Sequence, residues 1–169
     1  MKWSYNEKDN RYYVEGARIS FTNFTGTESD YNRAGSKNFK LRLDESLYNE
    51  LIDRNVRASM REPREEGDEP MYNVKVGVYP SSDIYLLTRK AKNRVDFDNL
   101  DIVDRSVSRG QIVNGEIDLS FHVSLNTKMA KPTYYLRCDE MYIPLKDPSK
   151  FEQKYENYGM EDDEPFDDD

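Results

Sequence analysis

The residue types that most often carry catalysis are scarce in this chain. His122 is the single histidine and Cys138 is the single cysteine, and they fall in opposite halves of the predicted sheet. One histidine and one cysteine placed in this way complete neither a zinc ligand set nor a nucleophile–base pair. We therefore interpret His122 as an ordinary surface histidine.

Other patterns typical of cofactor sites are also weak. Gly26, Gly35, Gly67 and Gly77 are isolated in the sequence, so they do not form a glycine-rich phosphate loop. Four aspartates between positions 96 and 104 could chelate Mg²⁺, but their spacing fits a solvated helical face better. We expect no enzyme activity, no metal and no cofactor.

A basic, hydroxylated and aromatic pattern is better defined. Period-two alternation predicts strands over Ala17–Phe24, Asn38–Leu43, Val56–Met60 and Tyr72–Val78. Their outward positions contain no acid, although 33 of the 169 residues are acidic. These positions are Arg18, Ser20, Thr22, Phe24, Asn38, Lys40, Arg42, Arg57, Ser59, Asn73, Lys75 and Tyr79.

Such a face suits a single strand of nucleic acid, because lysine and arginine neutralise phosphates while aromatic rings stack on bases. The predicted phosphate contacts are Arg18, Lys40, Arg42, Arg57 and Lys75, and the predicted stacking residues are Phe24, Tyr31 and Tyr79. Two further basic segments could close over the strand from either edge: a loop with Tyr31, Arg33 and Lys37, and a run with Arg89, Lys90, Lys92 and Arg94. An ordinary solvated sheet face is the alternative interpretation.

The remaining elements define a mostly β fold. Asp44 is a favourable N-cap for a helix running to about Arg54. Further strands are predicted over Ile84–Thr88, Glu116–Leu125 and Pro132–Ile143, the last with a bulge near residues 139–140. About seven strands, one clear helix, a short helical turn or two near 97–103 and long loops indicate an all-β class and a small, closed or partly closed antiparallel barrel.

The last nine residues hold most of the excess negative charge. The chain has 33 acids and 25 bases, hence a net charge of −8, and seven of the residues 161–169 are acidic. Without that segment, 26 acids face 25 bases. The sequence predicts a domain over residues 1–150 and a flexible acidic tail over 151–169. The tail could compete with an anionic ligand for the basic face, or it could only improve solubility.

Several broader expectations follow from composition. A single cysteine indicates a reducing compartment, and no run approaches the roughly 20 apolar residues of a membrane helix. We expect a cytoplasmic protein without a membrane partner. The oligomeric state, a homodimer included, is left open.

Four segments resemble the small replication proteins of tailed bacteriophages: Gly16–Gly26, Tyr31–Phe39, Arg61–Pro70 and Val113–Gly115. The resemblance spans about residues 14–145. Those proteins are regarded as single-stranded-DNA-binding proteins with an OB-type barrel. The resemblance thus implies an OB-like barrel, sequence-tolerant binding of single-stranded DNA, and a role in phage DNA replication or recombination in the infected bacterial cell.

The C-terminal segment resembles the acidic tips of bacterial and phage single-strand binders, which recruit replication proteins. The resemblance lies in residues Asp162, Asp163, Glu164, Pro165 and Phe166. Phe166 is not terminal here, because Asp167–Asp169 follow it. This departure weakens the expectation for partners that grip a terminal carboxylate together with the ring.

Two other functions fit parts of the sequence. A phage-encoded DNA mimic that inhibits a host protein would use the net charge of −8, although mimicry needs a fixed charge array and the excess charge lies in the tail. A structural interaction module would show stable high-order assembly without salt-dependent DNA binding.

Overall fold

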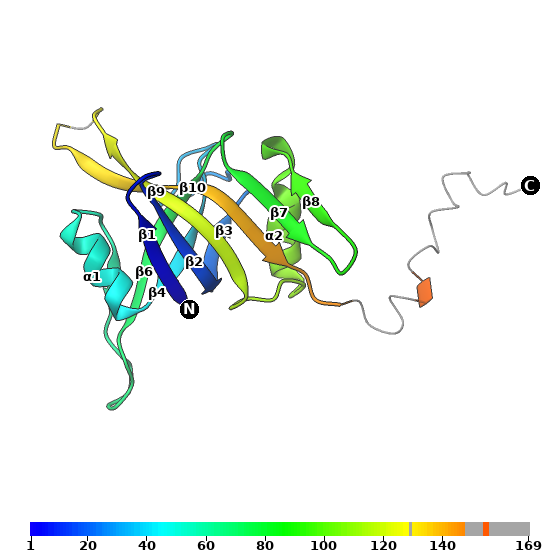
Figure 1. Ribbon diagram of the computed structural model, residues 1–169, viewed down its shortest axis with the longest axis horizontal. Helices are drawn as coiled ribbons and strands as arrows, with labels where there is room; N and C mark the ends of the chain where they lie inside the picture. The colour runs from blue at the N-terminus through cyan, green and yellow to red at the C-terminus, as the bar shows by residue number, and fades with distance from the viewer. Residues whose placement is uncertain (129, 148–153, 156–169) are drawn as a thin grey trace, which may run out of the picture.

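The computed structural model describes residues 1–128, 130–147 and 154–155, and its main feature is a ten-stranded sheet (Figure 1). The helical segments are α1 (Glu45–Asp53), a 3-10 turn η1 (Phe97–Asn99) and α2 (Asp101–Ser108). The strands are β1 (Lys2–Asn6), β2 (Arg11–Ala17), β3 (Ile19–Asn23), β4 (Lys37–Leu43), β5 (Ser59–Arg61), β6 (Met71–Val78), β7 (Asp83–Leu87), β8 (Lys92–Val95), β9 (Ile117–Asn126) and β10 (Thr133–Pro144).

Strand pairing gives the order of an OB-type barrel. Segment 11–23 is one bent strand whose first half, β2, pairs with β9 and whose second half, β3, pairs with β4. β4 pairs with β6, β6 with β10, and β10 with β9, so the order returns to its start. A helix, α2, precedes the fourth of these five strands along the chain. The predicted mostly β, OB-like fold is therefore confirmed. The prediction that all its strands pair antiparallel is wrong, because β10 runs parallel to β6 and to β7.

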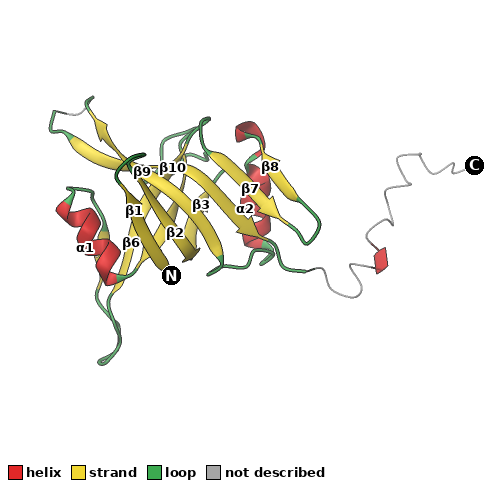
Figure 2. Ribbon diagram, viewed as in Figure 1, coloured by secondary structure: helices red, strands yellow, loops and turns green. Residues whose placement is uncertain are grey.

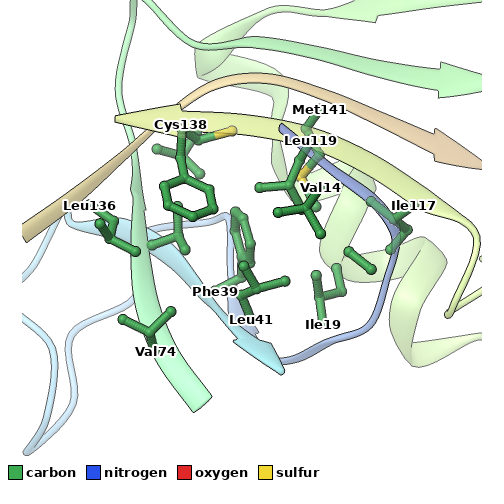
Figure 3. Packing of buried hydrophobic residues seen from close by; sticks show 14 of the residues in the cluster. Val14, Ile19, Phe39, Leu41, Val74, Ile117, Leu119, Leu136, Cys138 and Met141 are labelled. Atoms are coloured by element: carbon green, nitrogen blue, oxygen red, sulfur yellow. The ribbon is translucent and has the colours of Figure 1, made fainter. Parts of the chain in front are cut away.

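The barrel interior is filled by the apolar side chains at the inward-facing positions of the alternating strands. Phe39 and Leu41 of β4 are 0% exposed, and Val76 of β6 is 0% exposed. Figure 3 shows these β4 side chains converging with Val14 and Leu119 from the strands across the barrel. Each large apolar side chain buried in this way contributes roughly 1.5–3 kcal/mol to stability. The packing fixes the register of each strand and thereby the identity of its outer face.

The helix α1 forms for the reason that the sequence predicts. The Asp44 carboxylate accepts a hydrogen bond of 2.8 Å from the backbone amide of Leu47, which satisfies a free donor of the first turn. Leu47 and Leu51 are both 0% exposed and anchor the helix on the barrel. Figure 2 shows α1 and α2 on opposite sides of the barrel.

A bulge in β10 changes the neighbour of that strand. The β9–β10 register shifts between Cys138 and Glu140, as predicted. Before the shift β10 pairs with β6, and after it β10 pairs with β7. β7 in turn forms a hairpin with β8, so the predicted basic run 89–94 leads into a strand.

A second bulge overturns one prediction about β3. The β3–β4 register shifts between Ser20 and Asn23, and Phe21 has a positive φ of 45°. The alternation that places Phe21 inward and Phe24 outward is therefore wrong. Phe21 is 77% exposed, whereas Phe24 is 0% exposed and stacks on Phe39 with ring centroids 5.7 Å apart.

Candidate nucleic-acid interface

The outer faces of β4 and β6 place two lysines side by side. In the register of these strands Lys40 is directly opposite Lys75, and Arg42 is opposite Asn73. Side chains directly opposite on one face of an antiparallel pair have Cβ atoms about 4.5–5.5 Å apart. The predicted alignment of Lys40, Arg42 and Lys75 on one surface is thus what the register produces.

An aromatic and cationic cluster adjoins these lysines. Arg137 of β10 is opposite Gly77 of β6 across the parallel pair. A Cβ atom on Gly77 would lie 2.7 Å from the ring of Tyr79, so this ring occupies the space above the glycine. The Arg137 guanidinium lies 4.1 Å from the centroid of the Tyr79 ring, and the Tyr135 ring is 6.4 Å away. We call Lys40, Arg42, Lys75, Tyr79 and Arg137 the cationic face.

The tyrosine in this cluster keeps its proton at neutral pH. Burial raises the pKa of Tyr79 above its ordinary value of 10, Tyr135 adds to this shift, and the nearby Arg137 charge opposes it. The hydroxyl is therefore a neutral donor, and the ring can stack while the guanidinium remains free to contact an anion.

Arg18 lies at the edge of this surface rather than at its centre. It is exposed at the bend between β2 and β3, and its carbonyl accepts a hydrogen bond from the Arg42 amide. Both arginines line a depression of about 420 Å³ together with Asp44, Glu45 and Glu69. The depression therefore places Arg18 beside Arg42, at the end of the cationic face where acidic side chains also lie.

Arg57 is exposed but lies outside a regular strand. The strand predicted over Val56–Met60 is β5 at Ser59–Arg61, and Val56 forms an isolated bridge with Tyr134 of β10. This bridge brings Arg57 toward the seam between β6 and β10. Arg57 therefore borders the cationic face but does not belong to the paired strands β4 and β6.

Two loops border the outer face. Tyr31, 93% exposed, and Arg33 lie in the segment between β3 and β4, as predicted. Lys128 and Lys131 lie in the hairpin between β9 and β10, which projects from the barrel (Figure 1). OB-type barrels bind oligonucleotides on the face of their second and third strands with the aid of these two loops. The second and third strands here are β4 and β6.

Two predicted binding residues point elsewhere. Phe24 is fully buried, so it cannot stack on a base. Lys37 falls on the inward phase of β4, where its ammonium donates to the carbonyl of Phe97 and lies 4.1 Å from the Phe97 ring centroid. Both residues stabilise the barrel rather than line its cationic face.

The basic run 89–94 is partly neutralised by neighbouring acids. Arg89 lies 2.8 Å from Asp147, and Arg94 lies within 3.3 Å of both Asp83 and Asp96. Lys92 instead lies over the stacked rings of Tyr85 and Tyr142, and Lys90 is exposed. Within this run, Lys90 and Lys92 are therefore the bases that no neighbouring acid neutralises among the described residues.

His122 has a structural partner. Its Nδ1 lies 2.9 Å from the carboxylate of Asp139, which also lies 3.4 Å from the Arg11 guanidinium. These contacts join β9, β10 and β2 on the outer surface. The described part of the chain contains no group of three or more His, Cys, Asp or Glu side chains that could hold a metal ion.

Sequence reasoning missed Tyr135, Arg137 and Phe21. The alternation of Leu136 and Cys138 indicates that Tyr135 and Arg137 face outward, but their place beside Gly77 depends on the parallel pairing of β6 with β10. The exposure of Phe21 depends on a bulge at a residue type that rarely adopts a positive φ.

Within the described ranges, no helix has the length and apolar character needed to cross a bilayer. The tail residues Asp162, Asp163, Glu164, Pro165 and Phe166, predicted to bind partners, lie outside the described residues.

Comparison with solved structures supports the fold. The single-stranded DNA-binding protein from bacteriophage Enc34 aligns with a TM-score of 0.55 and 8% identity, over 96% of this chain and 100% of that chain. A C-terminal truncation of the same protein aligns with a TM-score of 0.53 and 9% identity, over 83% of this chain and 88% of that one. Its complex with ssDNA aligns with a TM-score of 0.51 and 9% identity, over 85% and 90% of the two chains.

Sequence comparison gives the family. No curated protein matches the chain. Residues 3–102 match the family model described as "Putative phage ssDNA-binding domain". This match covers more than half of the 169 residues and includes β4, β6 and most of the cationic face. The chain therefore belongs to the phage ssDNA-binding domain family.

Proposed function

We propose that this protein binds single-stranded DNA on the cationic face, without reading its sequence. The observation that carries the proposal is the direct pairing of Lys40 with Lys75, next to the Tyr79 ring under Arg137. Two adjacent cations repel each other, and phosphates spaced along a polynucleotide relieve that repulsion. The family match and the fold shared with a phage protein solved with ssDNA support the choice of ligand.

Each part of the cationic face suits one part of a nucleotide. Lys40, Arg42 and Lys75 can neutralise phosphates, while the rings of Tyr79 and Tyr135 offer flat surfaces to unpaired bases. Base–aromatic stacking contributes about 1–3 kcal/mol per base and tolerates any base, because every base has a π-face. Affinity should thus depend on strandedness and salt far more than on sequence.

The test is a fluorescence anisotropy titration of labelled oligo-dT and of a duplex of equal length, across a range of salt concentrations. If Lys40, Arg42, Lys75 and Arg137 each neutralise one phosphate, these four contacts alone should contribute about −3 to the slope of log affinity against log salt. Oligo-dT should bind more tightly than duplex. Equal, weak and salt-insensitive binding to both would contradict the proposal.

The acidic tail has two roles in this proposed function. Residues 161–169 carry seven of the 33 acids, whereas the rest of the chain is nearly neutral. The tail thus competes with DNA for the cationic face and, once displaced, offers Phe166 to proteins of phage DNA replication or recombination in the host cytoplasm. Deleting residues 161–169 should tighten oligo-dT binding, most strongly at low salt, where electrostatic screening is weak.

A matched variant separates the two roles of the tail. Phe166→Ala keeps all seven acids, so it should leave the DNA affinity unchanged while weakening the capture of a replication protein. Deletion of residues 161–169 should affect both measurements. Unchanged DNA affinity after the deletion would remove tail competition from the scheme and leave binding on the cationic face intact.

A further inference from the structure

Phe21 combines high exposure with a strained backbone. Its side chain is 77% exposed, and its φ is 45°, in the left-handed region. Among the described residues, the other non-glycine positions with positive φ are Asn10 and Asn55. Asparagine tolerates that region, whereas a bulky aromatic residue rarely adopts it. Phe21 is thus the backbone outlier among the described residues.

The fold gives no reason for the ring to be there. The core positions on either side are occupied by Ile19, 5% exposed, and Phe24, 0% exposed. The Lys40 ammonium lies over the Phe21 ring, 5.0 Å from the ring centroid. Glycine at this position would relieve the backbone strain and remove an exposed apolar surface. Strain kept in this way at an exposed residue indicates a role in binding.

The bulge places the ring beside the cationic face. Ser20, the residue before Phe21, is opposite Lys40, and Asn23 is opposite Asn38, so the extra residue lies next to β4. Lys40 therefore touches the Phe21 ring on one side and is paired with Lys75 on the other. A ligand bound at Lys40 would therefore lie beside the exposed Phe21 ring.

We propose that Phe21 is a base-stacking residue of the DNA site and that the bulge in β3 exists to hold its ring outward. This inference rests on the proposed binding of single-stranded DNA. An unpaired base stacks on the ring while the Lys40 ammonium neutralises the adjoining phosphate. The bases of a duplex are stacked on one another and their faces are not free, so Phe21 favours single strands over duplex.

The experiment compares Phe21→Ala, Phe21→Gly and Phe21→Tyr in the full chain. The probe is labelled oligo-dT, with a duplex of equal length as the second ligand. Loss of one stacked base should weaken oligo-dT binding between about 5-fold and about 150-fold in Phe21→Ala and Phe21→Gly. Phe21→Tyr keeps a stacking ring and should bind like the wild type. Duplex binding and the salt slope should stay unchanged, because no charge is removed.

A stability measurement separates binding from a structural role. Phe21→Gly should melt above Phe21→Ala and at least as high as the wild type, since glycine accepts the positive φ. Wild-type affinity in both truncated variants would overturn the inference and point to a protein contact for Phe21, and a large loss of stability in Phe21→Gly would also overturn it. If the wild type itself fails to bind oligo-dT, the proposed function fails instead.

Discussion

Lys40 of β4 lies directly opposite Lys75 of β6, and both side chains emerge from the outer face of the barrel. Like charges directly opposite each other on a sheet are destabilising. Opposite charges at the same positions would stabilise the barrel, so stability alone does not account for this pair. An anionic ligand bound between the two lysines would offset their repulsion.

Neutralising either lysine should have opposite effects on stability and on binding. Lys40→Gln or Lys75→Gln relieves the repulsion, so the melting temperature should stay the same or rise slightly. The slope of log affinity for oligo-dT against log salt should become less steep by about 0.7 for each lost phosphate contact. Lys8→Gln, an exposed lysine in the turn between β1 and β2, removes the same charge and should leave the slope unchanged. Equal effects of all three substitutions would indicate a general charge effect rather than a site.

Gly77 should matter for binding because it makes room for the Tyr79 ring. A Cβ atom at this position would lie 2.7 Å from that ring, and the backbone of Gly77 does not require a positive φ. Gly77→Ala should therefore fold with a modest loss of stability but displace Tyr79 from beneath Arg137. Oligo-dT affinity should fall by about as much as in Tyr79→Ala, between about 5-fold and about 150-fold for one stacked base.

A double-mutant cycle tests that explanation of Gly77. If Gly77→Ala acts only through the ring, combining it with Tyr79→Ala should add little to the loss of affinity. Additive losses would show that the glycine affects DNA binding by another route. Thermal unfolding of all three variants provides the check on folding.

The basic run 89–94 should bind through its lysines and not through its arginines. Arg89 is paired with Asp147, and Arg94 with Asp83 and Asp96, whereas Lys90 and Lys92 form no salt bridge with an acid among the described residues. The double variant Lys90→Gln/Lys92→Gln should reduce the salt slope by up to about 1.4. The matched variant Arg89→Gln/Arg94→Gln removes two charges from the same run. It should leave the slope unchanged and lower stability by up to about 1 kcal/mol for each arginine.

The sequence predicts well those parts of the fold that depend on residues close together in the chain. The N-cap at Asp44 depends on a side chain and an amide three residues apart, and the strand β6 depends on alternating valines. The bulge near Glu140 is visible because a long alternation slips by one residue. Each of these signals is contained in a few consecutive residues.

The sequence-based predictions fail where two nearby residues could each occupy the same structural position. In β3, Phe21 and Phe24 compete for one core position, and the period-two pattern assigns it to Phe21. The bulge reverses that assignment through a positive φ at a phenylalanine, which no residue preference predicts. Lys37 was misassigned because its partner, Phe97, is 60 residues away along the chain.

The cationic face as a whole could be predicted only in part. The basic outward phase of β4 and β6 follows from their alternation, so the sequence predicts that Lys40, Arg42 and Lys75 share one surface. Arg137 joins them through a parallel pairing between distant strands, and strand partners cannot be derived from the alternation of one sequence. The neutralising partners of Arg89 and Arg94 also depend on tertiary contacts.

Tyr12 should make the barrel less stable in alkali. It is 0% exposed, donates a hydrogen bond of 2.8 Å to Glu50 and accepts one of 2.9 Å from Arg54. Burial raises its pKa from 10 to about 12, with Arg54 opposing and Glu50 adding to the shift. The unfolded chain therefore loses this proton first as the pH rises. The stability due to Tyr12 is complete below pH 10 and is lost progressively as the pH rises toward about 12.

The substitution Tyr12→Phe should remove that pH dependence while keeping the ring that packs 5.2 Å from Phe121. Urea unfolding at several pH values between 8 and 12 gives the comparison, with the difference between variant and wild type as the readout. At neutral pH the variant should lose about 0.5–1.5 kcal/mol, because Glu50 and Arg54 lose a hydrogen-bond partner. The difference in unfolding free energy between the variant and the wild type should narrow above pH 10. Tyr31→Phe, at a ring 93% exposed, is the control. A gap that stays constant up to pH 12 would show that ionisation of the buried Tyr12 hydroxyl does not limit the alkaline stability of the barrel.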